Sequence, residues 1–454
     1  MQTVHFIAIG GQSMSGIAAM LLKRGYKVTG SDLRESDLTR RLESMGAEIH
    51  IGHRQENLGT PDVVVVSSAI GPDNPELRLA REKGIPVVHR MDMLLSILSG
   101  LNLLAVAGSH GKTTTTSMLA WILQQTGLDP TFMLGGELIG QGTSHTGSGD
   151  YAVFETDESD GSFLKAKPDV AVVTNIDNDH LENWGSMQAL EDAFFKFLES
   201  VKPGGLRVVC QDDPVLGKWA VGRPRAETYG FSPEALWRIS EVRSEGWGQR
   251  ASVQRGGEFL CVLRIQVPGR HNLQNALGAL VAAVHCGLSP ESVLKALETY
   301  PGVKRRLERV GEYAGVLLLD DFAHHPSEMS ACLRTVREVM PKSRIIVVFQ
   351  PHRYSRTRLL GRELGQALSR GDFVFVTGIY AGPGEKVEDG TSSMFVAQAV
   401  EDAGGRVRLA EDGDEAMRQA VGMSRAGDVI ITMGAGDIWK THKDAVQSIL
   451  TRGE

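Results

Sequence analysis

Short apolar runs alternate with longer amphipathic stretches from residue 4 onward. In the first hundred residues this pattern predicts strands at 4–9, 27–29, 63–67 and 87–88, and helices at 15–24 and 91–98. Strands that alternate with helices are typical of a doubly wound, parallel sheet. Because the pattern breaks at Ser99-Gly100, we expect a first domain over residues 1–99.

The same alternation predicts two further α/β domains, over residues 100–302 and 303–454. In the second domain it predicts strands at 103–107, 151–154, 170–173 and 206–210, and helices at 112–125, 187–200, 272–285 and 290–297. Residues 215–268 are richer in Arg, Trp and alternating polar positions, which indicates a β-rich insertion. In the third domain it predicts strands at 316–319, 344–349, 373–376 and 429–432, and helices at 327–339, 357–368, 394–403 and 415–421.

Composition and charge narrow the class of protein. Lys plus Arg number 48 against 55 Asp plus Glu, and the net charge of −7 argues against binding a nucleic-acid backbone. No apolar stretch reaches the roughly 18 residues that a membrane helix needs, and no signal-peptide pattern is visible. The four cysteines lie far apart, which favours free thiols over disulfides or a zinc site. We therefore expect a cytoplasmic protein without membrane insertion.

The most informative stretch is A-V-A-G-S-H-G-K-T-T-T-T at residues 105–116. A buried strand leads into a glycine turn and then a helix, and the backbone N–H groups of such a turn can hold phosphate. Lys112 would reach the terminal phosphates, and the Thr113 hydroxyl would bind Mg²⁺. Val106 stands where the long form of this pattern has glycine, so the match is to the shorter G-x-x-G-K-T. The loop predicts a nucleoside triphosphate; the alternative is a strand–helix turn of structural origin.

A second glycine loop, I-G-G-Q-S-M-S-G at residues 9–16, follows the first predicted strand. Asp32 comes 22 residues after Gly10, as in a dinucleotide fingerprint where an acid binds a ribose hydroxyl. However, two of the three fingerprint glycines are replaced, by Ala8 and Ser13. This favours the diphosphate of a nucleotide sugar, or a purely structural turn, over NAD.

Acidic residues follow two strands of the central domain. E-T-D-E-S-D occupies residues 155–160, and T-N-I-D-N-D-H occupies residues 174–180. Because ligands of α/β sheets bind at the carboxyl ends of the strands, both segments should converge on the phosphate loop. The alternatives are a solvated acidic loop and, for Asp177 and Asp179, helix capping.

These motifs, together with four others, closely resemble the Mur ligases of peptidoglycan synthesis. The resemblance covers nearly the whole chain and is carried by residues 9–16, 108–116, 155–163, 174–180, 268–275 (P-G-R-H-N-L-Q-N), 320–326 (D-D-F-A-H-H-P), 349–357 (F-Q-P-H-R-Y-S-R-T) and 433–438. It implies an N-terminal Rossmann-like domain for a UDP-sugar, a central P-loop-type ATPase domain, and a C-terminal Rossmann-like domain for an amino acid. The implied partners are ATP, UDP-N-acetylmuramate and L-alanine, with Mg²⁺ as cofactor and a monomer or homodimer as the working state.

The resemblance also implies roles for individual residues. The implied ATP-binding residues are Gly108, Ser109, His110, Gly111, Lys112, Thr113, Thr114, Asn272, Asn275 and Asp321. Thr113, Glu155 and His180 would hold the metal, and Lys112, His180 and Arg306 would act in catalysis. The implied UDP-sugar residues are Gly10, Gly11, Ser13, Met14, Ser15, Asp32 and Ser67. The implied amino-acid residues are His325, His352, Arg353 and Arg356.

The implied reaction is ATP-dependent ligation through an acyl phosphate, because a carboxylate is a poor electrophile until it is phosphorylated. Three departures from the family pattern stand out: Ala8 and Ser13 in the first loop, and Phe322 where the family has tyrosine. The nearest alternative is the related ligase that adds a tripeptide to UDP-N-acetylmuramate during murein recycling. An NAD-dependent oxidoreductase and an ATP-driven binding module remain as alternatives of other classes.

Overall fold

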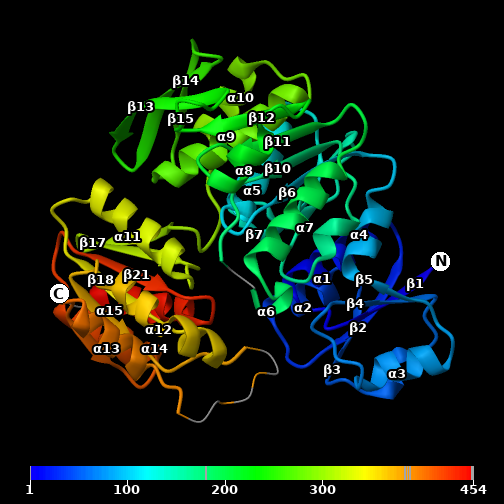
Figure 1. Cartoon of the computed structure of the whole chain (residues 1–454). Coiled ribbons are helices and arrows are strands. Elements are labelled where there is room, and N and C mark those ends of the chain that lie inside the picture. Colours follow the sequence, from blue (N-terminus) through cyan, green and yellow to red (C-terminus); the bar gives the residue numbers. More distant parts are fainter. Residues whose placement is uncertain (1, 179–180, 383–384, 386, 388–389, 451–454) are drawn as a thin grey trace. The chain divides into compact units, whose positions relative to one another are not determined.

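The computed structural model describes residues 2–178, 181–382, 385, 387 and 390–450. The strands of these residues form three sheets, which carry the three α/β domains of the chain (Figure 1). The chain divides into two compact units. The first unit runs to Arg243 and includes Arg250–Gln266 and Asn272–Pro301; the second comprises Ser244–Gln249, Val267–His271 and the chain from Gly302 onward. The boundaries predicted at 99/100 and 302/303 stay a prediction.

The N-terminal sheet has the strand order β3-β2-β1-β4-β5, and its neighbouring strands pair in parallel. Its elements are β1 (Thr3–Ile7), α1 (Gln12–Lys23), β2 (Lys27–Asp32), α2 (Asp37–Ser44), β3 (Glu48–Ile51), the 3-10 helix η1 (Gln55–Leu58), β4 (Val63–Val66), α3 (Pro75–Glu82), β5 (Val87–His89) and α4 (Arg90–Ile97). Along β1, Val4 and Phe6 pack with α1 and α4, while Ile7 packs with α3 on the other face. The chain adds β2 and β3 on one side of β1 and then β4 and β5 on the other. Helix α1, which follows β1, therefore begins at the switch point where such sheets bind ligands.

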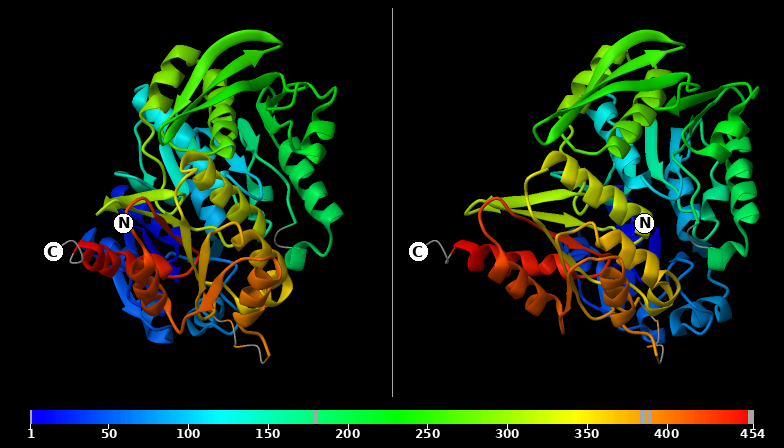
Figure 2. Two further views of the ribbon diagram at one scale, coloured as in Figure 1. Left: turned by 90° about the vertical axis from the view of Figure 1, so that its left-hand side faces the viewer. Right: turned by 60° about the vertical axis from the view of Figure 1, so that its left-hand side comes forward.

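The central sheet is the largest, with the order β15-β14-β13-β12-β11-β10-β6-β9-β7-β8 among the described residues. Its elements are β6 (Asn102–Ala107), α5 (Lys112–Gln125), β7 (Thr131–Leu138), β8 (Gly142–His145), β9 (Tyr151–Glu155), η2 (Ser162–Lys165), β10 (Val170–Val173), α6 (Leu181–Trp184), α7 (Met187–Glu199), β11 (Leu206–Cys210), α8 (Pro214–Ala220), β12 (Ala226–Gly230), β13 (Trp237–Glu245), β14 (Gly248–Arg255), β15 (Glu258–Ile265), α9 (Arg270–His285) and α10 (Pro290–Glu298). Figure 2 shows β13, β14 and β15 as long strands, drawn in green. The β-rich prediction for 215–268 is confirmed, but these strands extend the central sheet and are not a separate insertion.

The C-terminal sheet has the order β16-β17-β21-β18-β19-β20. Its elements are β16 (Glu308–Tyr313), β17 (Val316–Asp321), α11 (Pro326–Val339), β18 (Ile345–Phe349), α12 (Tyr354–Leu368), β19 (Phe373–Val376), α13 (Met394–Asp402), β20 (Val407–Leu409), α14 (Gly413–Met423), β21 (Val429–Met433), η3 (Ile438–Thr441) and α15 (His442–Leu450). Only the edge strand β16 pairs antiparallel among the described strands of this sheet. Helices α11, α12 and α13 cover one face, and α14 and α15 cover the other.

The predicted three-domain α/β class is confirmed. Several elements were missed, chiefly α2, β3, α3, β7, β8, β16, β20 and α15. The first helix begins at Gln12, three residues before its predicted start. The four cysteines are free, as expected. Within the described ranges, no helix has the length and apolar character needed to cross a membrane.

Candidate functional site

The phosphate loop connects β6 to α5, as predicted. Gly108 (φ +133°) and Gly111 (φ +82°) have backbone conformations that favour glycine. A Cβ at Gly108 would lie 2.1 Å from the Thr174 hydroxyl oxygen, and one at Gly111 would lie 2.6 Å from Asn275 Oδ1. Gly111 is the N-cap of α5 and, as a glycine, has no side chain to cap the helix, which leaves its first-turn amides at the loop. This is the helix N-terminus at which an anion is stabilised.

Lys112 is held by a buried carboxylate. Its Nζ lies 2.9 Å from both carboxylate oxygens of Glu158, and it also donates to the Gly108 carbonyl at 2.6 Å. The Glu158 side chain is 1% exposed, and that of Lys112 is 14% exposed. Burial opposes the charge on Lys112, but the carboxylates of Glu158, Asp157 and Glu155 outweigh it and raise the pKa of the amine. Burial raises the pKa of the Glu158 carboxyl, which its lysine partner only partly offsets.

A hydroxyl and a carboxylate stand beside this pair. Thr113 Oγ1 donates to Glu155 Oε2 at 2.8 Å, and the same oxygen accepts from the Gly135 N–H at 2.9 Å. Thr113 lies in the first turn of α5, and Glu155 ends β9. Hydroxyl and carboxylate oxygens are the ligands that Mg²⁺ prefers, so these residues fit the predicted metal role. His180, the third predicted ligand, lies outside the described residues.

The carboxyl end of β10 meets the same loop. Asn175 accepts from the Ser109 N–H through its carbonyl and from the His110 N–H through Oδ1. His110 Nε2 lies 2.9 Å from Asp177 Oδ2, and the Thr174 hydroxyl donates to the His110 carbonyl at 2.6 Å. The predicted convergence of residues 155–160 and 174–178 on the loop is therefore confirmed. Ser109 and His110 both direct their N–H groups to Asn175.

Helix α9 brings two predicted ATP residues to the loop. Asn272 and Asn275 lie one turn apart and are buried, and Asn275 Nδ2 donates to Asn272 Oδ1 at 3.3 Å. Asn275 Oδ1 occupies the space beside Gly111 where a Cβ would lie. The pair thus borders the turn that carries Lys112.

The first glycine loop connects β1 to α1 and is tied to Asp32, which ends β2. The Gly10 N–H donates to Asp32 Oδ2 at 2.9 Å. Ala8 has φ +64°, a left-handed conformation that is unfavourable for a residue with a Cβ. Met14 and Ser15 are buried; the Ser15 hydroxyl donates to the Gln12 carbonyl, and the Ser15 N–H donates to the Gly11 carbonyl. Gly11 is exposed, Gly10 and Ser13 are half-buried, and the half-buried Ser67 follows β4.

One acid of the 155–160 run joins the central domain to the N-terminal domain. Asp160 Oδ2 accepts from the Ser68 hydroxyl at 2.8 Å and from Arg90 Nη2 at 2.9 Å. His89, Ser162, Arg90 and Ser68 together hold the pKa of Asp160 well below its usual range despite burial. Neither Asp160 nor Glu158 was among the predicted site residues, although both lie in the acidic run that the sequence pointed to.

In the C-terminal domain, Asp321 ends β17 and is buried. Its Oδ2 accepts from the Leu307 N–H at 2.6 Å, and its Oδ1 accepts from the Ala323 N–H at 2.8 Å. Burial raises the pKa of Asp321 to about 6, against the lowering effect of Arg306. Both oxygens thus bind backbone groups, and the predicted contact of Asp321 with ATP stays a prediction.

The predicted amino-acid residues lie largely together at the carboxyl edge of this sheet. His352 Nδ1 is 3.4 Å from Arg356 Nη1, and its ring lies 6.0 Å from that of His324. Arg353 is the N-cap of α12 with φ +70°, and His325 is the buried N-cap of α11. Burial and the neighbouring histidine and arginines lower the pKa of His352 to about 3. Burial also lowers the pKa of His324, to about 4, so both rings are neutral near pH 7.

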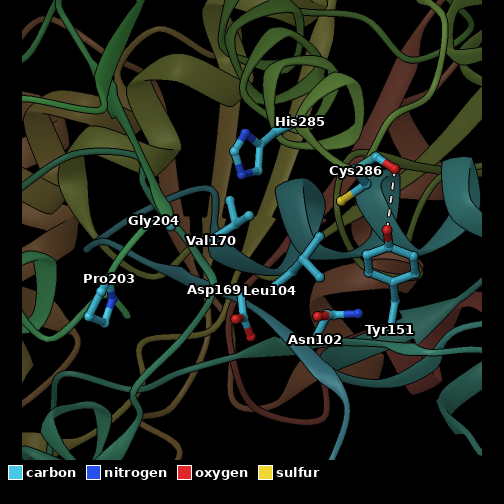
Figure 3. Close-up of a pocket in the computed structure, with 10 residues that line it drawn as sticks. Asn102, Leu104, Tyr151, Asp169, Val170, Pro203, Gly204, His285 and Cys286 are labelled. Carbon is cyan, nitrogen blue, oxygen red and sulfur yellow. Dashed lines mark hydrogen bonds between the residues drawn. The ribbon is translucent and has the colours of Figure 1, made fainter.

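A cavity of about 290 Å³ lies elsewhere on the central sheet (Figure 3). Its walls include Asn102, Tyr151 and Val170, the first residues of β6, β9 and β10, and Cys286 just beyond α9. The phosphate loop lies at the opposite, carboxyl ends of those strands. The cavity contains none of the predicted site residues.

Comparison with known families agrees with the geometry of these domains. The family model described as Mur ligase family, catalytic domain, matches residues 3–100; the Mur ligase middle domain matches residues 106–283; and the Mur ligase glutamate ligase domain matches residues 305–436. A UDP-N-acetylmuramate–L-alanine ligase of Pelotomaculum thermopropionicum is 45% identical over 451 residues, which cover 98% of this chain and 97% of the relative. The chain belongs to the Mur ligase family.

Other Mur ligases give the same result. A UDP-N-acetylmuramate–L-alanine ligase of Streptomyces griseus is 45% identical over 96% of this chain and 95% of its own length. The crystal structure of the UDP-N-acetylmuramate–alanine ligase MurC of Thermotoga maritima has a TM-score of 0.87 at 29% identity and covers both chains fully. A murein peptide ligase of Psychrobacter arcticus has a TM-score of 0.73 at 23% identity over 99% of each chain, a likeness of fold.

Proposed function

We propose that this Mur ligase joins L-alanine to the carboxylate of UDP-N-acetylmuramate, with conversion of ATP to ADP and phosphate, in peptidoglycan precursor synthesis. The observation that carries the proposal is the phosphate loop, where Lys112 bonds Glu158 and the adjacent Thr113 bonds Glu155. Relatives that bear this activity's name match nearly the full chain at 41–45% identity. The loop supports binding of the triphosphate, and the names of the relatives support UDP-N-acetylmuramate as the substrate that is phosphorylated.

The chemistry needs charge neutralisation more than a protein nucleophile. The substrate carboxylate attacks the terminal phosphorus of ATP, ADP leaves, and the amine of L-alanine then displaces phosphate through a tetrahedral intermediate. Lys112 and the first-turn amides of α5 hold the phosphates, and Arg306 adds positive charge as the phosphoryl group moves. Because phosphate must displace Glu158 from Lys112, nucleotide binding and rearrangement of this pair are coupled.

Mg²⁺ is the cofactor that the donor set suits. We infer that Thr113 and Glu155 hold it, with His180 as the third predicted ligand. When bound, it would neutralise phosphate charge and help to orient the triphosphate. The Gly135 N–H keeps the Glu155 carboxylate aimed at Thr113, which reduces the reorganisation needed when the metal binds.

The two outer domains take the other substrates. We infer that the UDP-sugar is bound by Gly10, Gly11, Ser13, Met14, Ser15, Asp32 and Ser67. Arg353 and Arg356 would bind the carboxylate of L-alanine, with His325 and His352 beside them. The planar guanidinium forms two parallel hydrogen bonds to a carboxylate, which a lysine does not reproduce. Arg356→Lys should therefore raise the Michaelis constant for L-alanine and leave those for ATP and UDP-N-acetylmuramate near their original values.

Product mass tests the proposal directly. Purified protein is incubated with UDP-N-acetylmuramate, ATP and Mg²⁺, and with L-alanine, glycine, L-serine or a murein tripeptide in separate reactions. We expect UDP-N-acetylmuramoyl-L-alanine with stoichiometric ADP. A tripeptide product formed faster than the alanine product would favour the recycling ligase, whose solved relative shares the fold at 23% identity. Turnover of NAD in place of ATP would overturn the assignment.

A further inference from the structure

Two adjacent arginines of the C-terminal domain lie against one aromatic ring. The guanidinium carbon of Arg305 is 4.9 Å from the centroid of the Phe322 ring, and that of Arg306 is 5.2 Å from it. Both distances fall within the roughly 6 Å over which the face of a ring attracts a cation. Phe322 directly follows β17 and is half-buried, so the ring is shielded from solvent enough for this attraction to count.

The two arginines are held in different ways. Arg305 Nε is 3.2 Å from Asp320 Oδ2, its Nη2 donates to the Gly434 carbonyl, and a second ring, Trp439, lies 5.9 Å away. Arg306 has a looser partner, since its Nη1 is 3.8 Å from Glu328 Oε1, beyond hydrogen-bond distance. The face of Phe322 and the more distant Glu328 carboxylate therefore act together on the direction of the Arg306 guanidinium.

Asp321, the residue before Phe322, holds the backbone around Arg306. Arg305 and Leu307, on either side of Arg306, have φ +60° and +49°, which are unfavourable for residues with a Cβ. The Asp321 carboxylate compensates by accepting from the Leu307 N–H, and the Phe322 N–H donates to the Arg305 carbonyl at 2.7 Å. Two consecutive residues at the end of β17 thus hold the turn and the side chain of Arg306.

We propose that Phe322 is a positioning residue for ligation, whose ring face holds the Arg306 guanidinium ready for the phosphate, while Asp321 fixes the turn that carries it. The inference rests on the proposed function, because the interaction of Arg306 with the transferred phosphoryl group is taken from there. It accounts for the departure from the family's tyrosine, since the attraction uses the face of the ring and not a hydroxyl. Fluorination of the ring tests this, because it weakens the negative potential of the face while hardly changing its size.

The experiment replaces Phe322 with mono-, di- and trifluorinated phenylalanine in the full-length protein. We expect kcat for ligation to fall stepwise, by about three- to tenfold at the trifluorinated ring. Phe322→Tyr should keep most of the activity, and Phe322→Leu should lose at least as much as the trifluorinated ring. In isotope-labelled protein without substrates, the side-chain NMR signal of Arg306 should move in Phe322→Leu, because the ring current is removed.

Phe373 provides a matched control, because its ring also faces an arginine, with Arg408 at 5.7 Å. The same fluorinated series at Phe373 should leave kcat unchanged. A flat kcat across the Phe322 series, or a rise in the L-alanine Michaelis constant alone, would overturn the positioning role. Absence of ligation by the unmodified protein would instead overturn the proposed function, and the NMR signal would still report whether the ring holds Arg306.

Discussion

The molecule contains two glycine loops that connect a parallel strand to a helix, and they differ in what surrounds them. The loop after β6 carries Lys112 and meets acids from β9 and the segment beyond it. The loop after β1 has no lysine or arginine between residues 8 and 16, and its Gly10 N–H is bonded to the carboxylate of Asp32. Both place a helix N-terminus at a switch point of the sheet.

This difference between the loops suggests that the N-terminal loop binds a substrate, whereas the central loop takes part in the reaction. Backbone N–H groups at a helix start suffice to hold a diphosphate that does not react. Transfer of a phosphoryl group also requires cations and metal ligands placed where charge develops. The central loop has a lysine and a threonine hydroxyl beside carboxylates, whereas the N-terminal loop has an adjacent carboxylate but no lysine or arginine. We therefore expect variants at the first loop to change substrate affinity, and variants at the central loop to change turnover.

The largest effect is expected when the Lys112–Glu158 pair is replaced together. Lys112→Met alone would leave a buried carboxylate without its cation, which costs about 3–5 kcal/mol of stability, so it is combined with Glu158→Gln. The double variant should fold and lose on the order of 10³-fold in kcat, as when a donor to developing charge is removed. Phosphate release measures this.

The control for that variant is Lys165→Met with Asp92→Asn, a solvent-accessible pair whose Nζ–Oδ2 distance is 2.6 Å. It should leave kcat unchanged. If the Lys112/Glu158 double variant keeps its ordinary turnover, the central loop does not have the role in turnover that distinguishes it from the first loop.

The next effect concerns the metal. Thr113→Val keeps the shape of the side chain and removes the hydroxyl that bonds Glu155. The Mg²⁺ concentration for half-maximal rate should rise about 10–100-fold, the range seen when support of a metal site is lost. Thr113→Ser restores the hydroxyl and should restore the Mg²⁺ response; an unchanged response in Thr113→Val would place the metal elsewhere.

A smaller effect, on affinity alone, is expected at the first loop. Asp32→Asn keeps an acceptor for the Gly10 N–H but removes the charge offered to a ribose hydroxyl. The Michaelis constant for UDP-N-acetylmuramate should rise about tenfold, and kcat and the ATP constant should change little. Asp37→Asn on the exposed start of α2 is the control. Tight binding of NAD in a calorimetric titration would contradict this assignment of the loop.

The smallest effect is on stability. Ala8→Gly should relieve the unfavourable φ of +64° and raise the free energy of unfolding by at most about 1 kcal/mol, because added flexibility of the unfolded chain offsets part of the gain. Ala19→Gly, within α1, should instead lower it by about 1 kcal/mol. Urea denaturation compares the two. Equal losses in both variants would show that Ala8 is not strained.

Strong local patterns made much of the fold predictable. Val170–Val173 and Phe373–Val376 have the predicted bounds, because short, continuous apolar runs between polar segments read clearly as buried strands. Helices α2 and α3 were missed because they are short and largely polar. Capping signals marked both: the N-cap Ser36 with Thr39 in the first turn of α2, and the N-cap Asn74 with Pro75 as the first residue of α3.

The sequence motifs predicted which segments form the candidate site. The sequence indicated that the acidic run meets the phosphate loop, but not that Glu158 is the acid that bonds Lys112. That choice depends on the path of the chain after β9. The Gly135 contact with Glu155 was also beyond prediction, because it comes from β7, a strand that the pattern did not reveal. Side-chain partners across strands depend on tertiary placement, which one sequence does not state.

We expect the Lys112–Glu158 pair to make the phosphate loop selective among anions. The amine already has a two-oxygen partner inside the protein, so a single weakly charged anion offers it less than it would give up. A triphosphate offers several charges at once and also reaches the amides of α5. The abundant small anions of a cell should therefore compete poorly with nucleotide at this predicted phosphate-binding loop.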